Sequence, residues 1–300
     1  MANIKTTADV AEWLAKKTAE AERHVDQTTA QTPKQMFLPG LEEAMRALPN
    51  HINRSSLFAP IARGRRRFHR QQEMVGRADV VVSYTGEQLD EADADLMLQL
   101  LFDARKHPLG HAVPFNRAAL LRSMGRATGR TQYEWLHRRM KALTEGTIFI
   151  EARHKDGTKK YRIGHTKAFH ILADISYDAD TEIYTYTLDP RWIIMFDNRE
   201  YSLLDWNKRL QIGTGQDLAK ALQRLFATSN DSPQRYGLDW LKGKMQYEGR
   251  TRDFKQSLDR AGLELKRLDI VTAMKIERST KGKDQLAVWL SDEHRHSVAL

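Results

Sequence analysis

The feature that most constrains this chain is a pattern of elements that occurs twice, at Asn116–Ile163 and at Asp239–Leu290. In each copy, residue spacing predicts a short helix, a turn, a longer helix and then a β-hairpin with a basic tip. The copies share this order of elements but little sequence identity. It is the order of a winged helix, whose longer helix enters the major groove of DNA. The sequence therefore predicts an α+β fold with two tandem winged-helix domains behind a helical or flexible N-terminal segment.

The elements of both copies can be placed by hydrophobic spacing and turn residues. The first copy is expected to have a short helix at Asn116–Gly125, a longer helix at Thr131–Glu145, and strands at Thr147–His154 and Lys159–Ile163. The second is expected to have a short helix from Asp239, a longer helix at about Thr251–Leu268, and strands near Ile270–Arg278 and Gln285–Leu290. Thr131 and Glu134 have capping-box spacing, which predicts that this motif begins the first longer helix.

Each longer helix is divided into an apolar face and a basic face. The apolar residues at helical spacing are Tyr133, Leu136, Met140 and Leu143 in the first helix, and Phe254, Leu258, Ala261, Leu265 and Leu268 in the second. Such a stripe would hold the helix on its own domain while the opposite face meets DNA. A solvated amphipathic helix is the alternative for either helix alone. Two such helices, each before a basic hairpin, favour DNA binding.

The candidate DNA-binding residues follow from this division. Base edges would be read from the outer helix faces by Arg130, Arg138, Lys141, Arg252 and Gln256, with Lys255 beside them. Phosphates would be contacted by the hairpin residues Lys155, Lys159, Lys160, Arg162, Lys275, Arg278, Lys281 and Lys283.

Composition agrees with a DNA-binding protein. The 300 residues carry a net charge of +9, and all of it lies after Pro60, where 41 basic residues face 32 acidic ones. The chain has no cysteine, which excludes disulfides and zinc–thiolate sites and suits a reducing cytoplasm. Its start has no apolar signal region, and no stretch is apolar for long enough to span a membrane. We expect a cytoplasmic protein without membrane contact.

Three segments are expected along the chain. Residues 1–60 would form an N-terminal helix, a linker and a short peptide; residues 61–198 and 199–300 would each form one winged-helix domain. A strand at Asp79–Thr85 and a helix at Asp90–Lys106 would complete the first domain. Tyr201–Ile212 is expected to be the opening helix of the second.

The sequence contains no complete motif of a P-loop NTPase or a rolling-circle nuclease. Gly213–Lys220 lacks the Gly-Lys-Ser/Thr ending with which a P-loop holds phosphate and Mg²⁺. His294 and His296 resemble the paired histidines of rolling-circle nucleases, but the strand context and nearby tyrosine that those enzymes need are missing. The sequence predicts no catalytic activity, no metal site and no cofactor.

With its elements placed, the chain resembles the TrfA-type replication initiators of plasmids. The resemblance extends from about Gln35 to the C-terminus. Its most telling stretches are Met45–Asn50, Arg54–Phe58 and Ser83–Leu89 leading into Asp93–Leu101, followed by Phe196, Tyr201, Trp206 and Leu210. The resemblance implies two winged-helix domains that bind direct repeats (iterons) in a plasmid origin. It also implies opening of adjacent AT-rich DNA, recruitment of the host helicase and polymerase sliding clamp, and a homodimer that restrains copy number.

The resemblance also suggests a clamp-binding peptide at Gln35, Met36, Phe37 and Leu38. In the family this peptide has a glutamine followed by an aliphatic–aromatic pair, and Pro39 stands where the aromatic residue is expected. A short apolar tether that packs on the first domain is the alternative.

Two other functions remain open from the sequence. A winged-helix transcription repressor could use the same domains, and an operator of inverted repeats bound by a dimer would favour it. A rolling-circle nicking enzyme would require a covalent adduct between a tyrosine and DNA.

Overall fold

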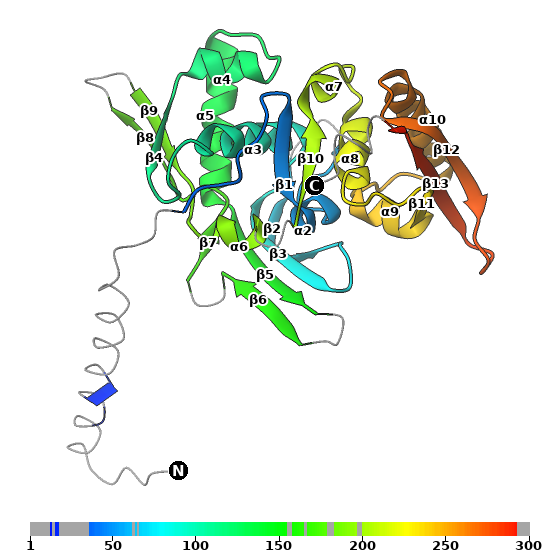
Figure 1. Ribbon diagram of the computed structural model, residues 1–300, viewed down its shortest axis with the longest axis horizontal. Coiled ribbons are helices and arrows are strands. Elements are labelled where there is room, and N and C mark those ends of the chain that lie inside the picture. The colour runs from blue at the N-terminus through cyan, green and yellow to red at the C-terminus, as the bar shows by residue number, and fades with distance from the viewer. Residues whose placement is uncertain are drawn as a thin grey trace. The chain divides into compact units, whose positions relative to one another are not determined.

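The computed structural model describes residues 36–292 except 62–63, 65, 155–157, 165–166, 179–182 and 197–199, together with Trp13, Lys16 and Lys17. Residues 1–36 and 37–300 form two separate units. Nearly all of the described residues belong to the second unit (Figure 1).

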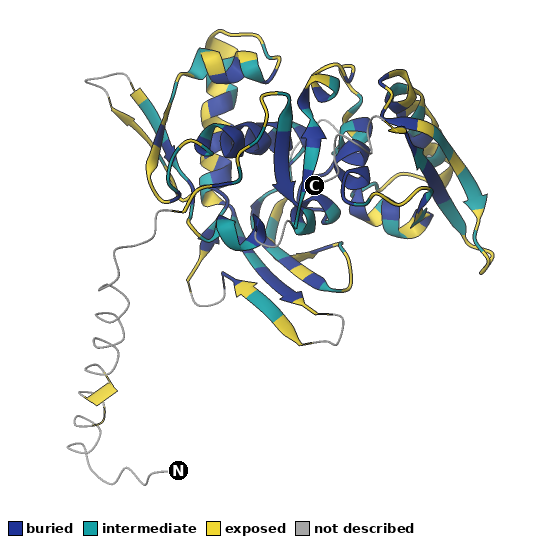
Figure 2. Cartoon of the chain, viewed as in Figure 1, coloured by how far each residue is buried: buried dark blue, intermediate teal, exposed yellow. Residues whose placement is uncertain are grey.

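The second unit contains two hydrophobic cores. The larger core is built mainly from residues between Leu38 and Leu204, and the smaller one from residues between Ile212 and Leu290. We call residues 37–205 the first lobe and residues 206–292 the second lobe. Trp206 and Ala227 of the second lobe pack into the larger core, so the lobes are joined by apolar contact. Buried residues occur in the helices and strands of both lobes (Figure 2).

The first lobe combines α-helices with antiparallel sheets. Its elements are β1 (Met45–Pro49), α2 (Asn50–Arg54), β2 (Phe68–Met74), β3 (Val80–Glu87), α3 (Glu91–Ala104), β4 (Ala112–Phe115), α4 (Arg117–Ser123), α5 (Arg130–Glu145), β5 (Thr147–Arg153), β6 (Lys159–Ile163), β7 (Phe169–His170), β8 (Asp174–Asp178), β9 (Ile183–Thr187), α6 (Trp192–Phe196) and β10 (Tyr201–Asp205). One sheet has the order β2-β3-β5-β6 with β7 also paired to β5, and a second has the order β4-β9-β8. Strands β1 and β10 form a separate antiparallel pair.

The second lobe repeats part of this plan. Its elements are α7 (Trp206–Leu210), α8 (Asp217–Phe226), β11 (Gln234–Gly237), α9 (Leu238–Lys244), α10 (Thr251–Arg267), β12 (Val271–Arg278) and β13 (Asp284–Leu290). The sheet order is β11-β13-β12. The predicted order of short helix, longer helix and hairpin is therefore present twice, as α4-α5-β5-β6 and as α9-α10-β12-β13. The coarse prediction of a mixed α and β fold is confirmed.

Two local predictions are wrong. Tyr201–Asp205 is a strand and not the start of a helix, because its backbone pairs with the distant strand β1; the helix α7 begins only at Trp206. Helix α5 begins at Arg130 without a side-chain cap, so the capping box predicted at Thr131 is absent. Glu134 instead forms an ion pair with Arg130 at 2.8 Å.

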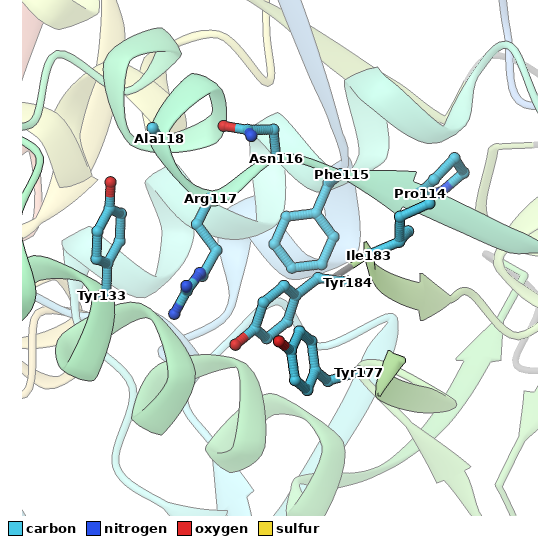
Figure 3. A pocket seen from close by; sticks show the side chains of 9 residues that line it. All are labelled: Pro114, Phe115, Asn116, Arg117, Ala118, Tyr133, Tyr177, Ile183 and Tyr184. Carbon is cyan, nitrogen blue, oxygen red and sulfur yellow. The ribbon is translucent and has the colours of Figure 1, made fainter. Parts of the chain in front are cut away.

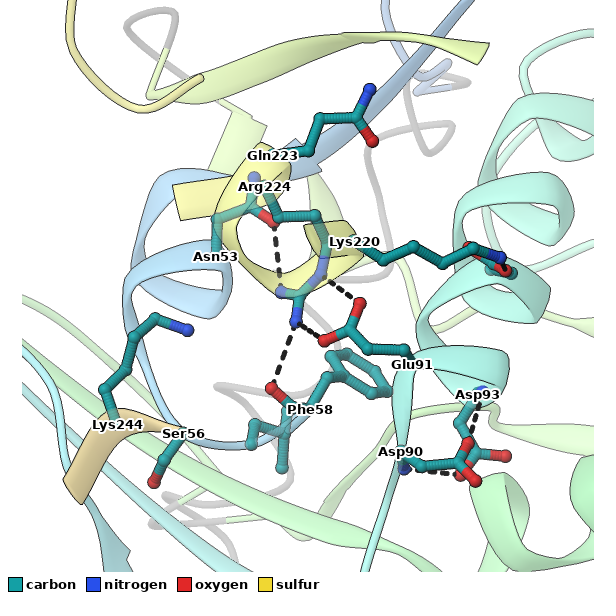
Figure 4. Close-up of polar contacts among 12 residues, drawn as sticks. Asn53, Ser56, Phe58, Asp90, Glu91, Asp93, Lys220, Gln223, Arg224 and Lys244 are labelled. Carbon is teal, nitrogen blue, oxygen red and sulfur yellow. Dashed lines mark hydrogen bonds and ion pairs between the residues drawn. The ribbon is translucent and has the colours of Figure 1, made fainter. Parts of the chain in front are cut away.

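A buried ionic network joins the lobes around Glu91, the first residue of α3. Its carboxylate accepts a hydrogen bond from Arg224 Nε at 3.1 Å (Figure 4). It accepts another from Arg209 at 3.0 Å, and all three side chains are fully buried. Burial alone would raise the pKa of Glu91, but the charges of Arg224 and Arg209 lower it to about 2. The carboxylate is therefore ionised, as two buried guanidinium groups require.

Lys244 of α9 is also buried in this contact. Its Nζ donates a hydrogen bond to the backbone oxygen of Ser55 at 3.2 Å. Burial and the charge of Arg224 lower the pKa of Lys244 to about 7. Gln246 and Trp240 of the second lobe donate to backbone oxygens of Ser56 and Gly76. These contacts hold α9 and the segment that follows it against the first lobe.

Candidate nucleic-acid interface

Helix α5 has the two-faced character that the sequence predicts. Leu136, Met140 and Leu143 are buried in the larger core, and Tyr133 packs against its edge. The opposite face is open to solvent: Arg130, Arg138 and Lys141 are all exposed. The ion pairs of Arg130 with Glu134 and of Lys141 with Glu145 are surface pairs, the second at 3.8 Å. Such pairs are weak, so a phosphate or base edge can replace the carboxylate at little cost.

The hairpin β5/β6 follows α5 directly, and its basic residues differ in exposure and in ion pairing. Lys159 is exposed. Lys160 forms an ion pair with Glu200, and Arg162 forms one with Glu151. Lys155, predicted as a phosphate contact, lies outside the described residues. Among the predicted contacts that the structure describes on this hairpin, Lys159 is the one most available to DNA.

Helix α10 has the same division as α5. Phe254, Leu258, Ala261 and Leu265 are buried in the smaller core. Arg252 and Gln256 are exposed near its N-terminus, whereas Lys255 is half-buried and pairs with Asp284 at 2.6 Å. The first turns of α10 therefore present one guanidinium and one amide to solvent, and these are the groups suited to guanine and adenine.

The hairpin β12/β13 ends in a tight basic turn. Ser279 N donates to Lys283 O at 2.8 Å, and Gly282 has a φ of +73°, a conformation that glycine adopts without strain. Lys281 and Lys283 are exposed at this tip, and Lys275 and Arg278 are exposed on the strand before it. Arg278 is 79% exposed and lies 3.9 Å from Asp284. This hairpin offers four positive charges to a polyanion.

The predicted clamp-binding residues differ in how far their side chains are buried. Met36 and Phe37 are 38% and 45% exposed, whereas Leu38 is 5% exposed and belongs to the larger core. Gln35 lies outside the described residues. Leu38 thus packs on its own lobe, which is the arrangement that the tether alternative describes.

A groove of about 490 Å³ beside α5 was not anticipated from the sequence (Figure 3). The Arg117 guanidinium lies 4.6 Å from the ring centre of Tyr133 and 4.5 Å from that of Tyr184, and the Tyr184 ring stacks on Tyr177 at 4.4 Å. Tyr177 and Ile183 are 49% and 45% exposed. The aromatic and β-branched residues of Ala168–Asp178 and Glu182–Asp189 predict strands, but the contact of these rings with α4 and α5 depends on tertiary packing.

The described part of the chain was compared with what a metal site and a membrane span require. Within it, no cluster of three histidine or acidic side chains could hold a metal ion. No helix there is both long and apolar enough to cross a membrane.

The family model described as "TrfA protein" matches residues 5–240, which is most of the chain. The chain belongs to the TrfA family. The predicted resemblance is thereby confirmed, and with it the coarse function of a replication initiator that binds DNA. The match ends within α9, so α10 and the hairpin β12/β13 lie beyond it.

Two solved structures of domains 2 and 3 of RctB match this TrfA-family chain. One has 12% sequence identity and a TM-score of 0.46, and covers 77% of this chain and 94% of its own. Another has 13% identity and a TM-score of 0.48, and covers 82% of this chain and 99% of its own. No curated protein matches the sequence.

Proposed function

We propose that this protein initiates plasmid replication by binding direct repeats in the origin through two winged helices, one in each lobe, and that it catalyses no reaction itself. One observation carries the proposal. In both lobes a longer helix buries an apolar stripe, exposes basic side chains, follows a short helix and precedes a hairpin that bears basic residues. Membership of the TrfA family supports the origin as the target.

The two lobes would bind neighbouring turns of one duplex. The exposed residues of α5 and α10 read bases, and the hairpins contact phosphates. Because the lobes are joined by a buried ionic network and by shared apolar packing, the spacing between the helices is set by the protein. A fixed spacing suits a monomer that reads a direct repeat of defined length.

Selection of bound duplexes from a random pool tests this function. The expected result is a single motif that spans about two helical turns and recurs as a direct repeat next to the coding region. Selection of inverted repeats by a dimer would support a transcription repressor instead. A covalent tyrosine–DNA adduct would support a nicking enzyme.

Host proteins would be recruited by residues other than the exposed basic side chains of α5 and α10. The groove lined by Tyr133, Tyr177 and Tyr184, which we call the aromatic groove, suits a protein partner, since exposed aromatic residues are enriched at interfaces. The sequence from Asp174 to Thr187 also contains four acidic residues, Asp174, Asp178, Asp180 and Glu182, and no basic one. We assign the helicase to this groove. Changing Tyr177 and Ile183 to Ala should abolish helicase capture and leave duplex binding unchanged; equal capture by the variant would contradict the assignment.

The sliding clamp would be met by the exposed pair Met36 and Phe37, next to Gln35. Changing Phe37 to Ala should then remove clamp retention in a pull-down without affecting DNA binding, since a few buried side chains supply most of an interface's affinity. Retention of the clamp by the variant would leave this segment with the role of a tether. The homodimer implied by the family would be the form that restrains copy number, and sedimentation with and without repeat DNA would detect it.

A further inference from the structure

A second pocket, of about 650 Å³, lies where the two lobes meet. The first lobe contributes Arg54, at the end of α2, and Arg77, in the turn between β2 and β3. The second lobe contributes Leu225, Thr228, Ser229, residues 231–237 and Trp240. A pocket of this size is within the range that holds small ligands, and neither lobe could form it alone.

The lining of this junction pocket is strongly basic. Arg54, Arg77 and Arg235 line it, and among its described lining residues Asp231 is the only acidic one. Asp231 already accepts a hydrogen bond from the Ser229 hydroxyl at 2.8 Å. Arg77 and Arg235 have carboxylate partners outside the lining, Asp79 at 3.2 Å and Glu277 at 3.1 Å.

Arg77 is close enough to Arg54 to disfavour the charge of the Arg54 guanidinium. Burial lowers the pKa of Arg54, and the nearby charge of Arg77 lowers it further, while the neighbouring Asp79 and Glu200 carboxylates and the Tyr236 hydroxyl act in the opposite direction. Arg54 is held in place because it donates to the backbone oxygen of Thr228. An anion between these arginines would relieve their repulsion, and a guanidinium donates paired hydrogen bonds to phosphate oxygens.

One wall of the pocket is aromatic and fixed. The rings of Tyr236 and Trp240 are stacked at 6.0 Å with an interplanar angle of 13°, and the Phe226 ring stacks on Tyr236 at 5.8 Å. The indole nitrogen of Trp240 donates to Gly76 O of the first lobe at 3.0 Å. A flat wall beside three arginines suits a phosphate group that is attached to a sugar or base.

We propose that the junction pocket binds a phosphate group, held between Arg77 of the first lobe and Arg235 of the second and steadied by Arg54. The phosphate can come from the DNA backbone or from a free nucleotide. The first source rests on the proposed function, whereas the second does not. In either case the ligand would bridge the lobes and strengthen their contact.

The test compares the wild-type protein with the double variant Arg77→Gln, Arg235→Gln. Both side chains are about half exposed, so the variant should fold, and circular dichroism would confirm this. Arg267→Gln is the matched control, since Arg267 is equally exposed and is also paired with a carboxylate, Glu264, at 2.8 Å. The probes are inorganic pyrophosphate, followed by calorimetry, and a mixed-sequence duplex, titrated over a range of salt concentrations.

The results distinguish the DNA backbone from a free nucleotide as the source of the phosphate. If the phosphate belongs to DNA, the double variant should flatten the plot of log K against log salt by about 0.9 for each lost phosphate contact, and the control should not. If it belongs to a free nucleotide, the salt slope should stay the same while the double variant loses pyrophosphate binding. An unchanged slope together with no pyrophosphate binding by the wild type would overturn the proposal. Should the wild type bind no duplex, the proposed function fails, and pyrophosphate alone decides on the pocket.

Discussion

Arginine–carboxylate pairs occur in two regions of this molecule, and the two regions use them differently. On the outer face of α5, Arg130 and Glu134 form a pair whose side chains are 93% and 60% exposed. Between the lobes, Arg224 and Glu91 form a pair that is fully buried. The exposed pair is cheap to break and can give way to DNA, whereas the buried pair cannot lose one partner without leaving a charge in the core. Burial therefore decides whether an arginine binds a ligand or maintains the fold.

The contrast is sharpest in two consecutive residues of α5. Arg138 is exposed on the outer face. Arg139 is buried and donates to Asp93 at 2.6 and 3.0 Å, and also binds Glu87. One step along the helix rotates the side chain by about 100°, which takes it from solvent to the interior. We propose that Arg138 lies in the DNA interface, whereas Arg139 belongs to the scaffold that orients α5 on α3.

The largest expected effect is on the buried pair. Changing Glu91 to Gln should lower the free energy of unfolding by about 3–5 kcal/mol, because Arg224 would keep its buried charge without a counter-charge and Arg209 would keep only Asp95 as its carboxylate partner. Urea denaturation measures this loss. The matched exposed change, Glu134→Gln, should cost less than about 1 kcal/mol. Equal losses of unfolding free energy in the two variants would show that burial does not make the Glu91 pair more important for stability than the Glu134 pair.

The pH dependence of stability should report on Lys244. In the folded protein its pKa is lowered to about 7 from 10.5. Above pH 7 the unfolded chain therefore binds more protons at this site than the folded chain, so rising pH favours folding. Relative to Lys244→Met, the wild type should gain up to about 1.4 kcal/mol per pH unit between pH 7 and pH 9. A difference between the two proteins that is independent of pH would contradict the burial of this charge.

Removing charge from the exposed hairpin tip should affect DNA binding and leave stability unchanged. Changing Lys281 and Lys283 to Ala should weaken binding to all duplexes and flatten the salt dependence by about 0.9 for each lost phosphate contact. Thermal unfolding should remain within the error of the wild type. A change confined to one preferred sequence would assign these lysines to base recognition.

Changing Arg130 to Ala removes the exposed pair on α5 and should affect stability far less than the loss of the buried pair. The free energy of unfolding should change by no more than about 0.5 kcal/mol, as for other helix pairs of this spacing. Affinity for the selected duplex should fall by about 1–3 kcal/mol if Arg130 contacts a base. Loss of stability without loss of affinity would reverse the assignment of this residue.

The sequence predicts the local elements of this protein well and its long-range contacts poorly. Helices α3, α5 and α10 and the two hairpins follow from hydrophobic spacing and turn residues, which are encoded within each segment. The pairing of Met45–Pro49 with Tyr201–Asp205 joins residues far apart in the chain, and no local pattern specifies it. For the same reason the helical prediction at Tyr201 is wrong.

The candidate site shows the same limit. Helical periodicity predicts that Arg138 and Arg252 are exposed, and the structure agrees. It cannot show that Lys255 and Lys160 have carboxylate partners, because Asp284 and Glu200 come from other elements. Nor can it show that Arg54 and Arg77 meet residues of the second lobe in one pocket.

The most direct test of two DNA-reading helices in one chain is a hydroxyl-radical footprint on the selected duplex. The wild type should protect two segments about one helical turn apart. Arg138→Ala should weaken protection mainly at one segment and Arg252→Ala mainly at the other, each with a loss of about 1–3 kcal/mol. A single protected segment, or the same segment weakened by both variants, would contradict the account.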